Sequence, residues 1–174
     1  MIELTIDDAD DRERAHEGEG ARTYVVFRLG GEGYALEVRR VREVLDLPAL
    51  TAVPGGPPSL LGVVNLRGHV VPVYDLRDPF GLPPGPEPAP ARAPGVLIVE
   101  SGPGPDPEAA GLRVDRVSDV LEFAPDEVQP APALGLGRAS PFVRGLIRHQ
   151  EGFLLVLDAD RVLEALGPGE NGGP

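Results

Sequence analysis

The sequence contains no cysteine and no lysine, and these two absences exclude several kinds of chemistry. Without cysteine there is no disulfide framework, no thiolate nucleophile and no cysteine-ligated metal. Without lysine the chain cannot supply the lysine of a Walker A phosphate loop or the amine of a Schiff-base enzyme. All 16 residues with a permanent positive charge are therefore arginines. Their planar side chains suit bidentate pairing with carboxylates in protein–protein contacts.

Long hydrophobic runs and an excess of basic residues are also missing. No apolar segment approaches the roughly 18 residues that a membrane-spanning helix needs. The N-terminus lacks the basic and apolar regions of a signal peptide. The net charge of -12 argues against nucleic-acid binding, which depends on neutralising phosphates. We therefore expect a cytoplasmic protein that does not insert into the membrane.

The acidic charge is concentrated at the N-terminus, where residues 1–20 contain eight acidic residues and two arginines. Such a segment has too little apolar surface to offset the entropy lost on ordering, so it predicts a disordered acidic tail over residues 1–21. Glycine and proline after Leu166 predict a second flexible tail at 167–174. The expected folded domain is therefore 22–166.

The folded part is patterned as short β-strands, with apolar residues at alternate positions. Proline- and glycine-rich stretches at Pro79–Gly95 and Ser101–Glu108 predict surface loops. An apolar stripe after Asp158 predicts a closing helix that Asp158 caps. The predicted strands are Tyr24–Leu29, Tyr34–Val38, Gly62–Leu66, Val70–Asp75, Val96–Glu100, Leu112–Asp115, Val117–Phe123, Phe142–His149 and Phe153–Leu157.

The chain also repeats itself. LEVRRVREVL at residues 36–45 is followed by LRVDRVSDVL at 112–121, and other matching pieces occur in the same order on both sides. In the last of these, Gly62 precedes Asp75 by the same interval at which Gly145 precedes Asp158. The repeat predicts two copies of one supersecondary unit. We expect a mostly β fold of two small five-stranded barrels related by a pseudo-twofold axis, with short helical turns and a C-terminal helix.

Each copy of the repeated phrase mixes two periods. Leu36 and Val38 alternate as in a strand, whereas Val41, Val44 and Leu45 follow at helical spacing. This pattern predicts a strand that runs into a short helical turn before the next strand.

The sequence Asn65-Leu66-Arg67-Gly68, followed by VVPVYDLR, resembles the signature hairpin of CheW-type chemotaxis coupling proteins. The resemblance extends over Thr23–Leu166. It implies two five-stranded barrels around a shared core, a C-terminal helix, and an adaptor that is not an enzyme. It also implies two partners: the regulatory domain of a CheA-type histidine kinase and the cytoplasmic hairpin tip of chemoreceptors. Recruitment to receptor arrays at the membrane would follow.

The resemblance implies five partner-binding residues. Val41 and Glu43 match positions tied to kinase and receptor contact, and Gly62, Asn65 and Arg67 match the receptor-facing stretch. The residues alone leave alternatives open. Arg67 at a hairpin tip could pair with a carboxylate on a receptor or remain solvated. Asn65 could bond to nearby backbone, Val41 could belong to the core, and Glu43 could be an ordinary surface charge.

No cofactor or metal is expected. The histidines His16, His69 and His149 do not have the spacing of a metal site, and no phosphate-binding loop is present. Two other functions remain open as hypotheses. A small barrel could bind single-stranded nucleic acid, although acidity and only eight aromatic residues oppose this. A hydrolase could use Asp75 and Asp158, although their matched positions predict helix N-caps instead.

Overall fold

The structure is a computed structural model that describes residues 20–83, 94–102, 104–132 and 137–166. Almost all of the predicted tail 1–21 and the whole of the predicted tail 167–174 lie outside these residues, as does most of the predicted loop Pro79–Gly95. The described part is mostly β, as the alternation of apolar residues predicts.

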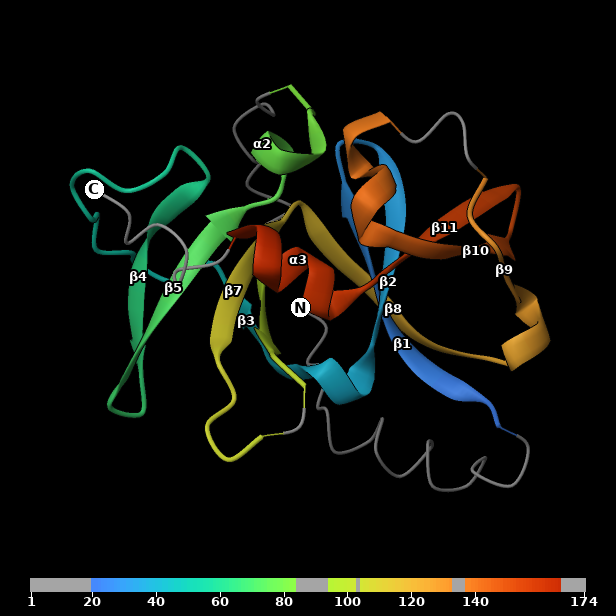
Figure 1. The fold of residues 1–174 in the computed structure, drawn as a ribbon, viewed down its shortest axis with the longest axis horizontal. Helices are drawn as coiled ribbons and strands as arrows, with labels where there is room; N and C mark the ends of the chain where they lie inside the picture. The colour runs from blue at the N-terminus through green and yellow to red at the C-terminus, as the bar shows by residue number, and fades with distance from the viewer. Residues whose placement is uncertain (1–19, 84–93, 103, 133–136, 167–174) are drawn as a thin grey trace.

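The strands of the described residues form two sheets, which lie side by side (Figure 1). The strand order of the six-stranded sheet is β8 (Arg116–Phe123), β1 (Arg22–Leu29), β2 (Glu32–Glu37), β11 (Gly152–Leu157), β10 (Val143–His149) and β9 (Val128–Gln129). The order of the five-stranded sheet is β3 (Val41–Asp46), β6 (Gly95–Glu100), β7 (Ala109–Val114), β5 (His69–Asp75) and β4 (Leu60–Leu66). All nine predicted strands are therefore present, while β3 and β9 were not predicted.

Short helices follow the last strand of each copy. α2 (Arg77–Phe80) follows β5, and α3 (Ala159–Leu166) follows β11. The prediction of α3 and its cap is confirmed, because the Asp158 carboxylate accepts a hydrogen bond of 3.2 Å from the amide of Arg161. The remaining helical turns of the described residues are η2 (Val38–Arg40), η3 (Pro125–Glu127) and η4 (Gly137–Phe142).

The loop predicted at Pro79–Gly95 is wrong at both ends, because Gly95 begins β6 and Pro79 and Phe80 belong to α2. Proline is tolerated there because α2 is a single turn. Phe80 is buried and stacks on Phe142 of η4, with ring centroids 5.2 Å apart. Burial of this aromatic pair stabilises a helix that is too short to persist alone.

Each sheet combines strands from both copies of the repeat. The first copy supplies β1 to β5 and the second supplies β6 to β11. The last strand of the first copy, β5, pairs in parallel with β7 of the second, and β11 pairs in parallel with β2 of the first. The third strands also cross over, since β3 pairs with β6 and β8 with β1. This reciprocal order is the one a pseudo-twofold axis requires, and it interlocks the copies.

The helical turn predicted from Val41, Val44 and Leu45 is misplaced. The turn lies earlier, at η2, and these three residues belong to β3. A β-bulge leaves Arg42 unpaired between Val41 and Glu43, so Val41 and Val44 both face the shared core. A bulge therefore produces a three-residue apolar spacing that imitates a helix.

The second copy has the same bulge at the same repeat position. Ser118 is unpaired in β8, and its hydroxyl donates a hydrogen bond of 3.1 Å to the carbonyl of Val26. A second pair of bulges lies before Gly62 in β4 and before Gly145 in β10. Matching irregularities at matching positions confirm the duplication at the level of the backbone.

Three hydrophobic clusters result from this arrangement. The largest lies between the two sheets, and each sheet has a smaller cluster of its own. On β1, Val25 and Phe27 join the shared cluster, whereas Tyr24 and Val26 join the cluster of the six-stranded sheet. β6 divides in the same way. Both faces of these strands are thus buried, which explains their continuous apolar sequence.

Ion pairs close the two places where a helix of one copy meets the other copy. At the α2 seam, defined by Arg77 and Asp115, the Nη2–Oδ1 distance is 2.5 Å. Gly30 also donates its amide to Asp115 at 2.9 Å. At the α3 seam, defined by Arg40 and Asp160, the corresponding distance is 2.5 Å. Each seam therefore joins the two copies by charge-assisted contacts to a single aspartate carboxylate.

Replacing Gly62 by alanine is expected to destabilise the fold. Gly62 has φ +154, and a Cβ there would lie 2.7 Å from the carbonyl oxygen of Thr51. The clash and the backbone strain together should lower the free energy of unfolding by about 2 kcal/mol or more. Urea unfolding measures this. Gly152→Ala is the matched control, since nothing lies within 4 Å of its Cβ, and equal losses for both variants would refute the explanation.

The α3 seam should contribute stability that depends on pH. The hydrogen bond from Arg40 lowers the pKa of Asp160 below its ordinary value, in spite of partial desolvation. A lowered carboxyl pKa gives stability above the unfolded pKa, about 3.9, and that stability is lost as pH falls through the folded pKa. Asp160→Asn should therefore have a lower melting temperature than the unmodified protein at pH 7. The loss in free energy of unfolding should be less than about 1 kcal/mol, because the carboxylate is half exposed. The difference should shrink towards pH 3, and a constant difference would contradict this account.

Candidate functional site

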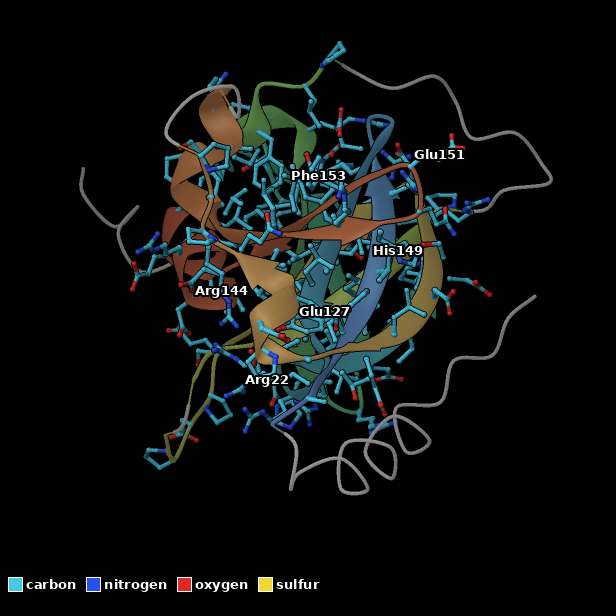
Figure 2. All side chains as sticks on the ribbon, turned by 90° about the vertical axis from the view of Figure 1, so that its right-hand side faces the viewer. Arg22, Glu127, Arg144, His149, Glu151 and Phe153 are labelled. Carbon is cyan, nitrogen blue, oxygen red and sulfur yellow. The ribbon has the colours of Figure 1, made fainter. Side chains whose placement is uncertain are left out.

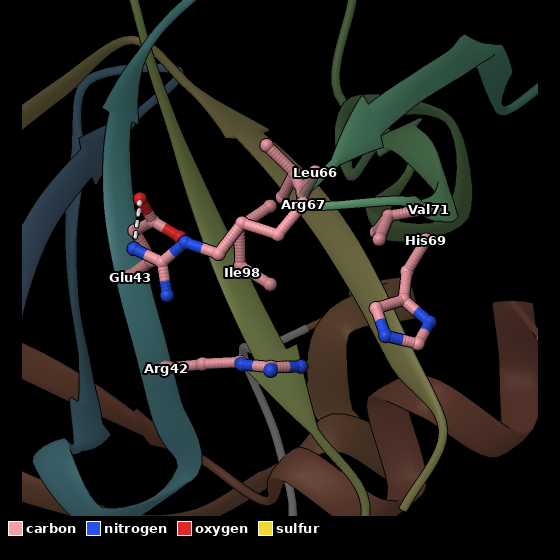
Figure 3. Close-up of a pocket in the computed structure, with 7 residues that line it drawn as sticks. All are labelled: Arg42, Glu43, Leu66, Arg67, His69, Val71 and Ile98. Carbon is pink, nitrogen blue, oxygen red and sulfur yellow. Dashed lines mark ion pairs between the residues drawn. The ribbon is translucent and has the colours of Figure 1, made fainter.

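The residues implied by the resemblance lie on the five-stranded sheet. Glu43 is on β3, and Arg67 is in the turn between β4 and β5 (Figure 3). Although β3 and β4 are at opposite ends of the strand order, Nη2 of Arg67 lies 3.7 Å from Oε1 of Glu43. The sheet therefore curls so that its two edges meet at this ion pair, as a small barrel requires.

The Arg67–Glu43 pair lies at the rim of a small hollow. In Figure 3 the side chain of Arg67 extends from the hairpin towards β3, and Arg42 lies below it across β6. Apolar side chains line the rest of the hollow together with His69: Leu66, Val71 and Ile98. The site is thus a mixed-charge rim over an apolar floor, which suits a protein surface better than a small ligand.

Arg67 is held in a strained backbone conformation. The turn has two residues between the partners Leu66 and His69, and φ is 52° at Arg67 and 86° at Gly68. Positive φ at both positions is the signature of a type I′ turn, where asparagine or glycine is usual at the first position. In this conformation the long cationic side chain of Arg67, which is 77% exposed, extends away from the hairpin tip.

The side chain of Asn65 stabilises this turn by a local hydrogen bond to the backbone. Its Oδ1 accepts a hydrogen bond of 3.0 Å from the amide of Gly68. This is the local backbone bond that the sequence left open as the alternative to partner binding. Asn65 therefore fixes the geometry from which Arg67 is presented.

Two of the five residues lack an accessible side chain for a partner. Val41 is 2% exposed and belongs to the shared core, which is the alternative that the sequence left open for it. Gly62 is buried, and Thr51 approaches its backbone closely. That approach is sufficient to explain why this position is a glycine.

Three further residues at this surface were missed. Arg42 is displayed by the bulge and lies 3.2 Å from Glu100, and His69 lines the hollow. Val70 is 67% exposed, which is unusual for a large apolar side chain beside a charged rim. The alternation of β5 carried this signal, because Val71 and Val73 point inward and Val70 must then point outward.

The hairpin of the second copy presents a related but different surface. Gln150 has φ 55°, like Arg67 in the first hairpin, and Phe153 is 50% exposed at the position equivalent to Val70. Figure 2 shows Phe153 with Glu151 and His149 on this face. The His149 ring packs edge-on against Phe123, with centroids 5.9 Å apart. The duplication thus preserved an exposed apolar residue but not the arginine.

Both carboxylates considered for catalysis accept a hydrogen bond from the backbone at the start of a helix. Asp75 accepts a hydrogen bond of 3.0 Å from the amide of Arg77, just as Asp158 accepts from Arg161. Burial raises the pKa of Tyr34 to about 12, with a further contribution from Glu32. No group of three or more possible metal ligands occurs in the described ranges. Asp158 is therefore an N-cap as expected, whereas Asp75 lies one residue before Leu76, the N-cap of α2, and bonds to the first amide of that helix instead.

The comparisons with known proteins agree with this geometry. Residues 23–167 match the model of the CheW-like domain. The chain belongs to the CheW-like family. The crystal structure of the scaffolding protein TtCheW from Thermoanaerobacter tengcongensis is similar, with a TM-score of 0.67 and 30% identity, covering 79% of this chain and 84% of that chain.

Curated relatives of CheW type cover most of the chain. The probable chemotaxis protein CheW of Rhizobium etli is 32% identical over 148 residues, which are 85% of this chain and 88% of that protein. The chemotaxis protein CheW of Bacillus subtilis is 31% identical over 140 residues, 80% of this chain and 85% of that protein. Protein PilI of Pseudomonas aeruginosa is 32% identical over 130 residues, 74% of this chain and 68% of that protein. This CheW-like chain is thus a chemotaxis-type scaffold, and none of its described helices is long and apolar enough to cross a membrane.

Removing the side-chain acceptor of Asn65 should loosen the hairpin tip. Asn65→Ala leaves the Gly68 amide without its partner, and the free energy of unfolding should fall by about 0.5–1.5 kcal/mol. Asn65→Asp keeps an acceptor in the same place and should retain most of the stability. Urea unfolding compares the three proteins, and equal losses for both variants would show that the hydrogen bond is unimportant.

Proposed function

We propose that this chain is a non-enzymatic adaptor that couples chemoreceptors to a CheA-type histidine kinase. Family membership supports a scaffold, and the surface formed by Glu43, Arg67 and Val70 supports a protein-docking role. We further propose that it works in the cytoplasm, recruited to receptor arrays. The observation that carries the proposal is the exposed Arg67, held at a strained turn and only loosely paired.

The receptor is the partner that suits Arg67. Its distance of 3.7 Å to Glu43 is longer than a charge-assisted hydrogen bond, so the pairing is weak in solvent. A carboxylate on a receptor helix can replace Glu43 and form a closer, bidentate contact. Packing of that helix over Val70 would exclude water and strengthen the new contact to about 1–3 kcal/mol.

The kinase regulatory domain is proposed to contact the β3 side of the same surface. Glu43 and Arg42 point outward from the bulge there, and their charges of opposite sign can set the register of a partner. Val41 packs beneath them in the core. Val41 is proposed to act on that contact by holding β3 in place rather than by touching the partner.

Nucleic-acid binding is less well supported by the charges of the described residues. Several arginines that would have to neutralise phosphates are already paired with carboxylates within the protein. These are Arg22, Arg40, Arg42, Arg67, Arg77, Arg113, Arg144 and Arg161. The acidic net charge opposes binding further.

Reversing the charge of Arg67 should weaken receptor binding without affecting the fold. In Arg67→Glu the side chain would repel a receptor carboxylate, and the dissociation constant should rise at least about tenfold. Binding to a soluble receptor signalling fragment is measured by calorimetry, and the fold is checked by a circular dichroism melt.

Arg116→Glu is the control, because it makes the same change in charge at an exposed position on the six-stranded sheet. It should bind within about twofold of the unmodified protein. Equal weakening by both variants would indicate a general charge effect, and unchanged binding of Arg67→Glu would remove Arg67 from the site.

A further inference from the structure

The two copies carry opposite charges at the corner that follows their second strand. The first copy has Glu37 and Arg39, and the equivalent residues of the second copy are Arg113 and Asp115. Repeat equivalence is set by the shared phrase at residues 36–45 and 112–121. The backbone plan is therefore the same at both corners, but the order of acidic and basic residues is reversed.

The last strand of the first copy and its helix carry a matching pair of charges. Asp75 ends β5 and Arg77 begins α2. In the structure they meet the corner of the second copy, where Asp75 lies 3.6 Å from Arg113 and Arg77 lies 2.5 Å from Asp115. Both contacts are attractive. Arg77 is only 8% exposed, so its charge acts in a poorly solvated position and interacts strongly.

The same strand would meet like charges if it paired within its own copy. Because β2 and β7 occupy equivalent places, β5 could in principle pair with β2 and close the first copy on itself. Asp75 would then face Glu37, and Arg77 would face Arg39. Both contacts would be repulsive, and the repulsion at Arg77 would act at a nearly buried charge.

We infer that the reversed charges at these two corners select the exchanged pairing, directing β5 and α2 to the second copy rather than to their own. Hydrophobic burial also differs between the two strands, because Tyr34 of β2 corresponds to Ala110 of β7 in the shared cluster, and the charges act in addition to this difference. Once β5 has paired with β7, the free edge of β2 remains available to pair with β11. The second seam follows from this placement, and there Asp160 pairs with Arg40.

The α3 seam does not carry the selection by itself. Asp158 and Glu37 are both acidic, and Glu37 is held instead by Arg144 at 2.7 Å and by Arg22 at 3.6 Å. The discrimination therefore resides in Asp75 and Arg77.

A charge-swap cycle in the full-length chain tests the attractive half of the inference. Asp115→Arg places two arginines together and should lower the melting temperature by about 5 °C or more. Adding Arg77→Asp restores opposite charges, so the double variant should melt above either single variant. If the effects of the two changes simply add, the pair carries no specific attraction and the inference fails.

A second experiment tests the selection itself, without altering the α2 seam. Arg39→Asp makes the first copy attractive to its own Arg77, whereas Arg39→Gln removes the same arginine without offering a partner. After dilution from urea, Arg39→Asp should show an additional slow refolding phase, from chains that first pair β5 with β2. Arg39→Gln should refold like the unmodified protein, whose proline isomerisation phases it shares.

Salt distinguishes an electrostatic trap from a packing defect. The additional phase of Arg39→Asp should shrink in 1 M sodium chloride, where charges are screened beyond about 3 Å. Identical refolding of the Asp and Gln variants, or a slow phase that persists at high salt, would overturn the inference. The absence of cysteine keeps disulfide exchange out of the kinetics.

Discussion

The parallel pairing of β5 with β7, and of β11 with β2, is the constraint on which the rest of the structure depends. Each pairing places strands of both copies in one sheet. As a result β1 and β6 are covered on both faces, and the large cluster between the sheets belongs to neither copy alone. A copy of the repeat on its own would leave much of this apolar surface in water, which is why the chain forms one domain rather than two.

The candidate site is a consequence of the same pairing. Glu43 and Arg67 both come from the first copy, but β6 and β7 of the second copy lie between their strands in the sheet. The curl of that five-stranded sheet then brings its two edges close enough for Arg67 and Glu43 to form an ion pair. The arrangement of the candidate site therefore requires that the copies interlock.

Local patterns predicted much of this fold because the physics behind them is local. Alternation placed nine strands, and Asp75 and Asp158 both precede helices, although only Asp158 is the N-cap that was expected. The same alternation gave a wrong prediction for β3, where a helical turn was expected. The bulge at Arg42 leaves one residue unpaired, which turns a spacing of two between apolar residues into a spacing of three. The choice of sheet partner is a long-range property, and the repeat reveals equivalence between strands without revealing which copy each one joins.

The site was predicted unevenly for a similar reason. Arg67 and Glu43 were named by resemblance, and their side chains do meet, but only the curled sheet shows that they meet each other. Asn65 and Gly62 act on the backbone of the hairpin and its bulge, so the motif that contains them has residues that shape the backbone beside the exposed Arg67. The second hairpin makes this separation visible. It retains the positive φ at Gln150 and the exposed apolar residue at Phe153 but has no arginine at its tip, so the backbone conformation of the hairpin persisted while the charge at its tip diverged.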